Sequence, residues 1–354
     1  ARATTDLDGN QTQEKVSFFN NALRHLILGA ELFPEGAFNL RFGYNFRRAE
    51  ELRIVDQRTF SGISVGVGIK LNKMNLKKIS TVFILLALLS CVKKEEPKNV
   101  TPKNVILLIA DGTGIAQVST AFYFKESAPN YGRFKHIGLI NTSSSSHNIT
   151  DSAAAGTAFA CGERTYNGAI GVSLDSLNIK NIVEVISTKN IKSGIIATSS
   201  ITHATPASFY AHAINRSMAE DIASDMVTSD VDFFAAGGIK YFNKREDKRN
   251  LLKELEEEKF VIDTISLDNF KNIENGERLG FLLADKAMPK MTENRGDFLE
   301  NATQLGIEFL SKDNSNFFMM VEGSQVDWGG HDNDGNYVIT ELLDFDEAVG
   351  KALD

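Results

Sequence analysis

Residues 104–110, with the sequence NVILLIA, form an unbroken apolar run that constrains the fold of this chain more than any other feature. A short run of branched and bulky apolar side chains predicts a central strand of a parallel sheet, buried on both faces. Asp111 and Gly112 end the run, and a helical apolar pattern follows over residues 115–124. This order places Asp111 at the carboxyl end of the strand, where open α/β sheets bind their ligands. An aspartate that only caps the next helix is the structural alternative.

Similar patterns recur along the rest of the chain. Further strands are expected at residues 193–198, 232–238 and 316–321. A helix with Pro206 in its first turn is expected to run toward Arg216, because proline suits a first helical turn. We therefore predict an α/β fold, a doubly wound and mostly parallel sheet sandwiched by helices, with a short β-hairpin fragment at the N-terminus.

Residues 150–158, with the sequence TDSAAAGTA, place one hydroxyl between a carboxylate and a run of small residues. The small residues favour a helix, and Asp151 supplies the polar start that a helix prefers. The oxygen of Ser152 would then lie at the positive end of that helix, where unpaired N–H groups attract an anion. A solvated helix cap is the alternative.

Residues 322–331, with the sequence EGSQVDWGGH, follow the strand expected at 316–321. Two carboxylates and an imidazole lie here among glycines, and buried carboxylates need cations. Asp327 with His331 is a zinc-type pair of ligands, whereas Glu322 with a threonine hydroxyl suits magnesium. This segment therefore predicts metal binding.

Five motifs together resemble the alkaline phosphatase family, in the family's order and over residues 104–354. They are Asp111-Gly112, residues 151–154, residues 165–168, residues 203–206 with Arg216, and residues 321–323 with Asp327 and His331. The resemblance implies a doubly wound α/β sandwich that hydrolyses phosphate monoesters with two zinc ions and one magnesium. It also implies that Ser152 is the nucleophile, forming a phosphoseryl intermediate, and that Arg216 clamps the phosphoryl oxygens.

The residues that the resemblance implies as metal ligands are Asp111, His203, Thr205, Glu322, Asp327 and His331. Asp111 would bridge a zinc and the magnesium, which Thr205 and Glu322 would also hold. Asp327 and His331 would hold the other zinc. His203 stands where some family members have an aspartate, so it would contact the magnesium directly or through water.

Residues 1–73 have a different character. Apolar and polar residues alternate over 38–46 and 63–71, and residues 26–30 hint at a third strand. Such alternation is typical of transmembrane β-barrels, and the segment resembles the C-terminal end of an outer-membrane barrel protein. An amphipathic hairpin of a soluble sheet is the alternative.

Residues 74–103 resemble a bacterial lipoprotein signal peptide followed by a polar tether. A basic start at Met74 precedes an apolar run over 79–89, which is too short to span a bilayer comfortably. The run ends just before Cys91, which would carry the lipid. A buried core helix is the alternative. The lipoprotein interpretation predicts a mature protein that begins at Cys91 and is anchored in the periplasm or cell envelope.

Three domains follow from these interpretations: residues 1–73, which we expect to belong to another protein, the signal segment 74–103, and an enzyme domain over 104–354. The family's remaining zinc ligands lie beyond the helix expected over 337–353. We therefore expect residues 92–354 alone to bind magnesium at best and to be nearly inactive. The net charge of −8 argues against a nucleic-acid partner, and a homodimer is left open.

Other functions compete with this one. A phosphodiesterase, a sulfatase or a phosphomutase-like enzyme of the same superfamily is the first alternative. A non-catalytic metal-binding lipoprotein is the second. Residues 1–73 alone would suggest a barrel or secretion component of the outer membrane.

Overall fold

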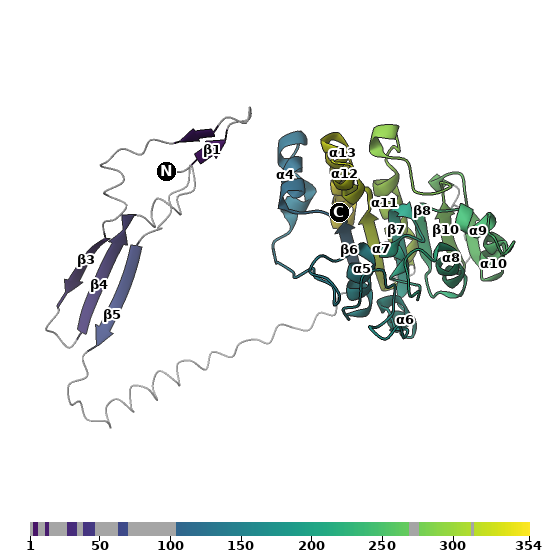
Figure 1. Cartoon of the computed structure of the whole chain (residues 1–354), viewed down its shortest axis with the longest axis horizontal. Coiled ribbons are helices and arrows are strands. Elements are labelled where there is room, and N and C mark those ends of the chain that lie inside the picture. Colours follow the sequence, from purple (N-terminus) through teal and green to yellow (C-terminus); the bar gives the residue numbers. More distant parts are fainter. Residues whose placement is uncertain are drawn as a thin grey trace, which may run out of the picture. The chain divides into compact units, whose positions relative to one another are not determined.

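The computed structural model describes residues 3–5, 11–13, 27–33, 38–46, 63–69, 104–268, 276–312 and 315–354. The chain divides into two compact units, Ala1–Asn99 and Val100–Asp354 (Figure 1). The predicted signal peptide and Cys91 lie outside the described residues. In the part of the chain that is described, no helix is both long and apolar enough to cross a membrane.

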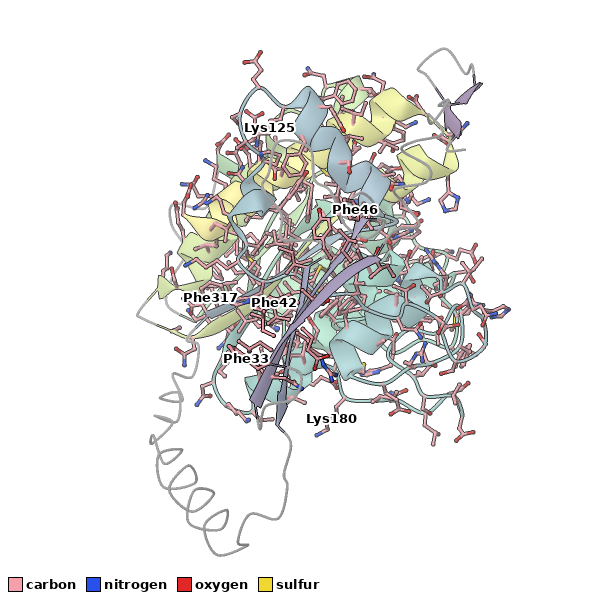
Figure 2. The ribbon with its side chains drawn as sticks, turned by 90° about the vertical axis from the view of Figure 1, so that its left-hand side faces the viewer. Phe33, Phe42, Phe46, Lys125, Lys180 and Phe317 are labelled. Carbon is pink, nitrogen blue, oxygen red and sulfur yellow. The ribbon has the colours of Figure 1, made fainter. Side chains whose placement is uncertain are left out.

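Among its described residues, the first unit contains two small antiparallel sheets. One pairs β1 (Ala3–Thr5) with β2 (Gln11–Gln13), and the other has the order β3 (Ile27–Leu32), β4 (Phe38–Asn45) and β5 (Ile63–Ile69). The three predicted strands are therefore present and pair as neighbours. Phe42, labelled in Figure 2, lies opposite Ala30 on one side and Val65 on the other. Apolar side chains of this sheet, such as Val65 at 64%, are exposed.

The second unit is built on a six-stranded sheet in which every pairing is parallel. Its order is β6 (Asn104–Ala110), β11 (Phe317–Gly323), β7 (Lys192–Ser200), β8 (Phe233–Gly237), β10 (Arg278–Leu282) and β9 (Phe260–Asp263). The predicted α/β fold is confirmed, and the three further strands expected from the sequence are β7, β8 and β11.

Helices cover both faces of this sheet (Figure 1). One face packs against α5 (Ser152–Cys161), α6 (Ile182–Ser187), α8 (Ala219–Thr228) and α10 (Leu251–Glu257). The other packs against α11 (Phe298–Leu310) and α13 (Gly335–Leu353). Neighbouring strand residues serve opposite faces: Ile195 belongs to the first core and Ile196 to the second.

Beyond β6, α4 (Ile115–Phe124) lies against α13 and is tied to it by an ion pair. Lys125, labelled in Figure 2, places its Nζ 2.5 Å from Oδ2 of Asp346, which is fully buried. The same carboxylate accepts hydrogen bonds from the backbone N–H groups of Asn130 and Tyr131. These contacts anchor residues 125–131 to α13.

Two expectations were wrong. β6 is an edge strand of the described sheet, and Val105 is 46% exposed, because only β11 pairs with it among the described residues. An apolar run indicates that a strand is buried, but it does not indicate whether the strand lies at the centre or at the edge of the sheet. The helix expected to run toward Arg216 does have Pro206 in its first turn, but it is only the short α7 (Ala204–Ala207), because the chain then turns back to pair Ala213 with Ile170.

Candidate active site

A cavity of about 1090 Å³ opens where β6 ends and α5 begins. The predicted site residues that line it are Asp111, Ser152, His203, Thr205, Arg216, Asp327 and His331. Glu322 does not line the cavity and is fully buried at the end of β11. Residues as far apart in sequence as Asp111 and His331 are thus brought to one region, at the carboxyl edge of the sheet.

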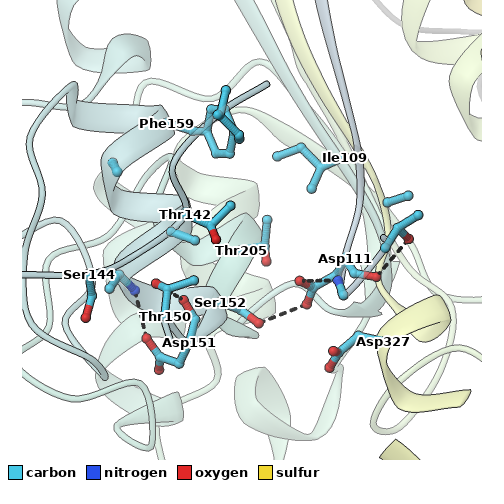
Figure 3. Close-up of a pocket in the computed structure, with 18 of the residues that line it drawn as sticks. Ile109, Asp111, Thr142, Ser144, Thr150, Asp151, Ser152, Phe159, Thr205 and Asp327 are labelled. Carbon is cyan, nitrogen blue, oxygen red and sulfur yellow. Dashed lines mark hydrogen bonds between the residues drawn. The ribbon is translucent and has the colours of Figure 1, made fainter. Parts of the chain in front are cut away.

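Ser152 is the first residue of α5, and its hydroxyl points across the cavity toward Asp111 (Figure 3). The Oγ donates a hydrogen bond of 2.9 Å to Oδ2 of Asp111. Asp151 caps the helix, accepting from the backbone N–H of Ala154 at 3.0 Å. The predicted N-cap is therefore present, and Ser152 lies at the positive end of the helix.

Asp151 also holds Arg216, a contact that the sequence did not reveal. Its Oδ2 accepts from Arg216 Nη1 at 3.1 Å and from the backbone N–H of Gly168 at 3.0 Å. Arg216 Nη2 lies 3.2 Å from Nε2 of His203. The guanidinium is therefore held by a carboxylate and an imidazole beside the start of α5. Asp151 and Arg216 lie 65 positions apart, so no local pattern signals this pairing.

Glu322 is a buried carboxylate with incomplete hydrogen bonding. Its Oε2 accepts from Ser324 Oγ at 2.5 Å, and the Thr205 hydroxyl also bonds to the group. Its Oε1 has no hydrogen-bond partner among the described residues. Burial, reinforced by the negative charge of Asp111, raises the pKa of Glu322 to about 8. Burial likewise raises the pKa of Asp111. Two such acids near one another favour a bound cation.

His203 is buried, and burial together with the charge of Arg216 lowers its pKa to about 4. Because a guanidinium only donates, Nε2 of His203 must accept, which assigns the ring proton to Nδ1. Nδ1 is buried with no partner among the described residues. A protonated nitrogen is not a metal ligand, so this arrangement favours contact with a cation through water. Trp328 packs edge-on against the ring, with centroids 5.5 Å apart.

Asp327 and His331 lie one turn apart on α12 (Gln325–His331), an element that the sequence did not predict. Asp327 Oδ2 is 3.4 Å from Nε2 of His331, whose side chain is 78% exposed. Asp327 packs against the turn after β6, where Gly112 has a φ of +60°. A Cβ on Gly112 would lie only 2.2 Å from Asp327 Oδ1, so only glycine fits there.

These donors differ in how well they fit each metal. Asp111, Thr205 and Glu322 supply the hard oxygen atoms that magnesium prefers, and the unpaired Oε1 of Glu322 suits such an ion. Zinc sites need three or four protein ligands, and Asp327 with His331 supplies two. Throughout the described ranges, no three His, Cys, Asp or Glu side chains form a metal-binding group. The residues thus fit magnesium, whereas those described do not complete a zinc site.

Comparison with known proteins gives one consistent result. The family model described as "Alkaline phosphatase" matches residues 102–354. Alkaline phosphatase 3 of Bacillus subtilis is 38% identical over 268 residues, which cover 71% of this chain and 57% of the relative. Alkaline phosphatase 4 of the same organism is 34% identical over 279 residues, covering 74% of this chain and 59% of the relative. The chain thus spans less than two thirds of the length of these relatives.

Solved structures show the same similarity. Alkaline phosphatase from the Antarctic bacterium TAB5 superposes with a TM-score of 0.70 and 58% identity, covering 71% of this chain and 74% of that one. A variant of that enzyme, with 59% identity and the same TM-score, is described with Mg bound in its M3 site; the match covers 71% of this chain and 73% of that one.

Proposed function

Given that the chain belongs to the alkaline phosphatase family, we propose that it serves the hydrolysis of phosphate monoesters through attack by Ser152. One observation carries the proposal: the Ser152 hydroxyl, at a helix N-terminus, points across a cavity to Asp111 while Arg216 lies on the same wall. A phosphoryl group there would meet positive charge from both the helix and the guanidinium.

Residues of this chain supply the nucleophile and position the phosphoryl group. By accepting a hydrogen bond from the Ser152 hydroxyl, Asp111 orients Oγ in the cavity. Arg216 offers a planar fork of donors to two phosphoryl oxygens, and Asp151 keeps that fork beside α5. Phosphoryl transfer depends mainly on such positioning and charge neutralisation, which these residues provide.

Asp111, Thr205 and Glu322 would hold magnesium, with His203 contacting it through water. When bound, a divalent cation lowers the pKa of a coordinated hydroxyl or water and neutralises charge on phosphoryl oxygens. Asp327 and His331 would contribute to a zinc site that needs further ligands.

For the N-terminal region, we propose a lipid on Cys91 that anchors the mature protein in the periplasm or cell envelope. The basic start at Met74, the apolar run over residues 79–89 and the cysteine at position 91 support this. Residues 1–73 remain proposed as the end of an outer-membrane barrel protein, and the antiparallel sheet of β3, β4 and β5 supports this.

Covalent labelling tests the role of Ser152. The protein is incubated with p-nitrophenyl phosphate, Zn²⁺ and Mg²⁺, quenched in acid and digested, and phosphopeptides are mapped by mass spectrometry. We expect phosphate on Ser152, even if turnover by this chain is slow, and none in the Ser152→Ala variant. Phosphate on another residue, or on none, contradicts the proposal.

A phosphodiesterase is the second candidate, since it shares the superfamily. A comparison of p-nitrophenol release from p-nitrophenyl phosphate and from bis(p-nitrophenyl) phosphate separates the two. The combination of Ser152, residues 203–206 and Arg216 favours the monoesterase. We expect the monoester to release p-nitrophenol faster than the diester, and the reverse order would favour the alternative.

A further inference from the structure

Arg216 is carried by two chain segments that run side by side, residues 168–171 and 213–216, which we call the Arg216 clip. Ile170 and Ala213 exchange two backbone hydrogen bonds of 2.9 Å. The backbone N–H of Arg216 donates to the carbonyl of Gly168 at 2.8 Å. The N–H of Gly168 in turn donates to Asp151, the carboxylate that holds the guanidinium. The clip therefore positions both Arg216 and Asp151, the carboxylate that binds its guanidinium.

On its inner side the clip is tied to α5, the helix that begins at Ser152. The Thr157 hydroxyl donates to the carbonyl of Ala169 at 3.0 Å and accepts from the N–H of Gly171 at 3.0 Å. Thr157 is fully buried, so this link is not replaced by solvent. The Thr157 side chain thus connects the clip to α5, the helix of the nucleophile, through two hydrogen bonds.

On its outer side the clip is tied by His212. Its Nδ1 lies 2.7 Å from the carbonyl oxygen of Gly171, which can only accept, so Nδ1 carries a proton. The backbone N–H of His212 donates to Asp225 of α8 at 2.9 Å. Its Nε2 lies 3.3 Å from Oε2 of Glu184 on α6, and the side chain is 15% exposed. His212 therefore joins the clip to two helices.

The His212 side chain packs closely against the backbone of Gly171. Gly171 has a φ of +59°, and a Cβ there would lie 2.8 Å from Nδ1 of His212 and 2.3 Å from the carbonyl oxygen of Ala211. The two segments can approach this closely only because residue 171 is glycine. A change in the His212 side chain would therefore be transmitted to the clip's backbone.

We propose that His212 is a positioning residue for Arg216: its Nδ1–H bond to the Gly171 carbonyl holds the clip in the register that sets the guanidinium beside Ser152. The inference rests on the proposed function, in which Arg216 binds phosphoryl oxygens. His212 itself is not among the residues that line the cavity.

Matched substitutions test the proposal, with inorganic phosphate as the probe and calorimetry of the full chain in Mg²⁺ as the measurement. His212→Asn keeps a donor near the Nδ1 position, whereas His212→Gln keeps a polar group only near Nε2. We expect His212→Gln to weaken phosphate binding on the order of tenfold and His212→Asn to stay within about twofold of wild type. Glu184→Gln, which leaves the Gly171 contact intact, serves as the control and should bind phosphate as wild type does.

A double-mutant cycle excludes a merely structural effect. In an Arg216→Ala background, His212→Gln should cause no further loss of phosphate affinity, because it acts through the guanidinium. An equal loss in both backgrounds, or no loss in either, overturns the proposal. If Arg216→Ala alone leaves phosphate affinity unchanged, the role proposed for Arg216 fails, and this inference fails with it.

Hydrogen exchange gives a readout that does not depend on phosphate. In His212→Gln, the amide of Arg216 should exchange faster, while amides in the buried strand β7, such as that of Ile195, keep wild-type protection. Unchanged protection at Arg216 contradicts the proposal. Loss of protection throughout β7 shows that His212 supports the whole fold and not the clip, which also overturns it.

Discussion

At the residue scale, the single side chain of Asp151 binds three neighbours. Asp151 caps α5 with one oxygen and holds Arg216 and Gly168 with the other. The sequence predicted the cap, because it depends on residues three apart in the chain. It could not predict the ion pair with Arg216, because that depends on how a distant loop returns to the helix.

Gly112 gives a prediction at this scale. Gly112→Ala should destabilise the protein by about 1–3 kcal/mol, since a Cβ would both clash with Asp327 and sit on a backbone with positive φ. Denaturant unfolding measures the effect. The loss should exceed that of Gly162→Ala, which has positive φ but open space, and of Gly132→Ala, which has neither problem. Equal losses for Gly112→Ala and Gly162→Ala would contradict a role for the contact with Asp327.

At the element scale, strands were easier to predict than their places in the sheet. The apolar runs marked β6, β7, β8 and β11 correctly, because burial selects apolar side chains. The edge position of β6 depends on which strands pair, and no local pattern records that. β9 and β10 were missed, as was α12, whose Gly329-Gly330 pair disfavours a helix by propensity.

Gln325 explains why α12 forms in spite of its glycines. The buried amide donates to the carbonyls of Thr198 at 2.9 Å and Met288 at 2.8 Å, and it accepts from the hydroxyl of Tyr337 at 2.7 Å. One side chain thus ties the first turn of α12 to β7, to the loop before η3 (Met291–Glu293) and to α13. These bonds fix the helix that carries Asp327 and His331.

Substitution of Gln325 tests whether its hydrogen bonds hold α12 in place. Gln325→Glu should cost about 3 kcal/mol or more of unfolding free energy, because a carboxylate cannot donate to two carbonyls. Tyr337→Phe should cost about 1–2 kcal/mol, since only one bond is lost. Urea unfolding of both variants checks the order. A Gln325→Glu variant as stable as wild type would show that α12 is held by other contacts.

At the scale of the whole molecule, the described hydrophobic core lies entirely in the unit Val100–Asp354. All three core clusters are drawn from residues after position 105. We therefore expect residues 100–354, expressed alone, to unfold cooperatively within about 2 °C of the midpoint of the full chain. Differential scanning calorimetry measures both. A midpoint several degrees lower would mean that residues 1–99 stabilise this core.

The central claim is that acids from separate strands converge to hold a cation beside Ser152, and a calorimetric Mg²⁺ titration tests it most directly. Because the pKa of Glu322 is about 8 without metal, a proton competes with Mg²⁺ at neutral pH. Affinity should therefore rise as the pH increases toward about 8 and then level off, with a proton released on binding at pH 7 but not at pH 9.5. Glu322→Gln should lose the proton release and most of the affinity, while Asp285→Asn, at an exposed acid, should behave as wild type. Unchanged Mg²⁺ affinity in Glu322→Gln, with no proton released by the wild type at pH 7, would contradict the account.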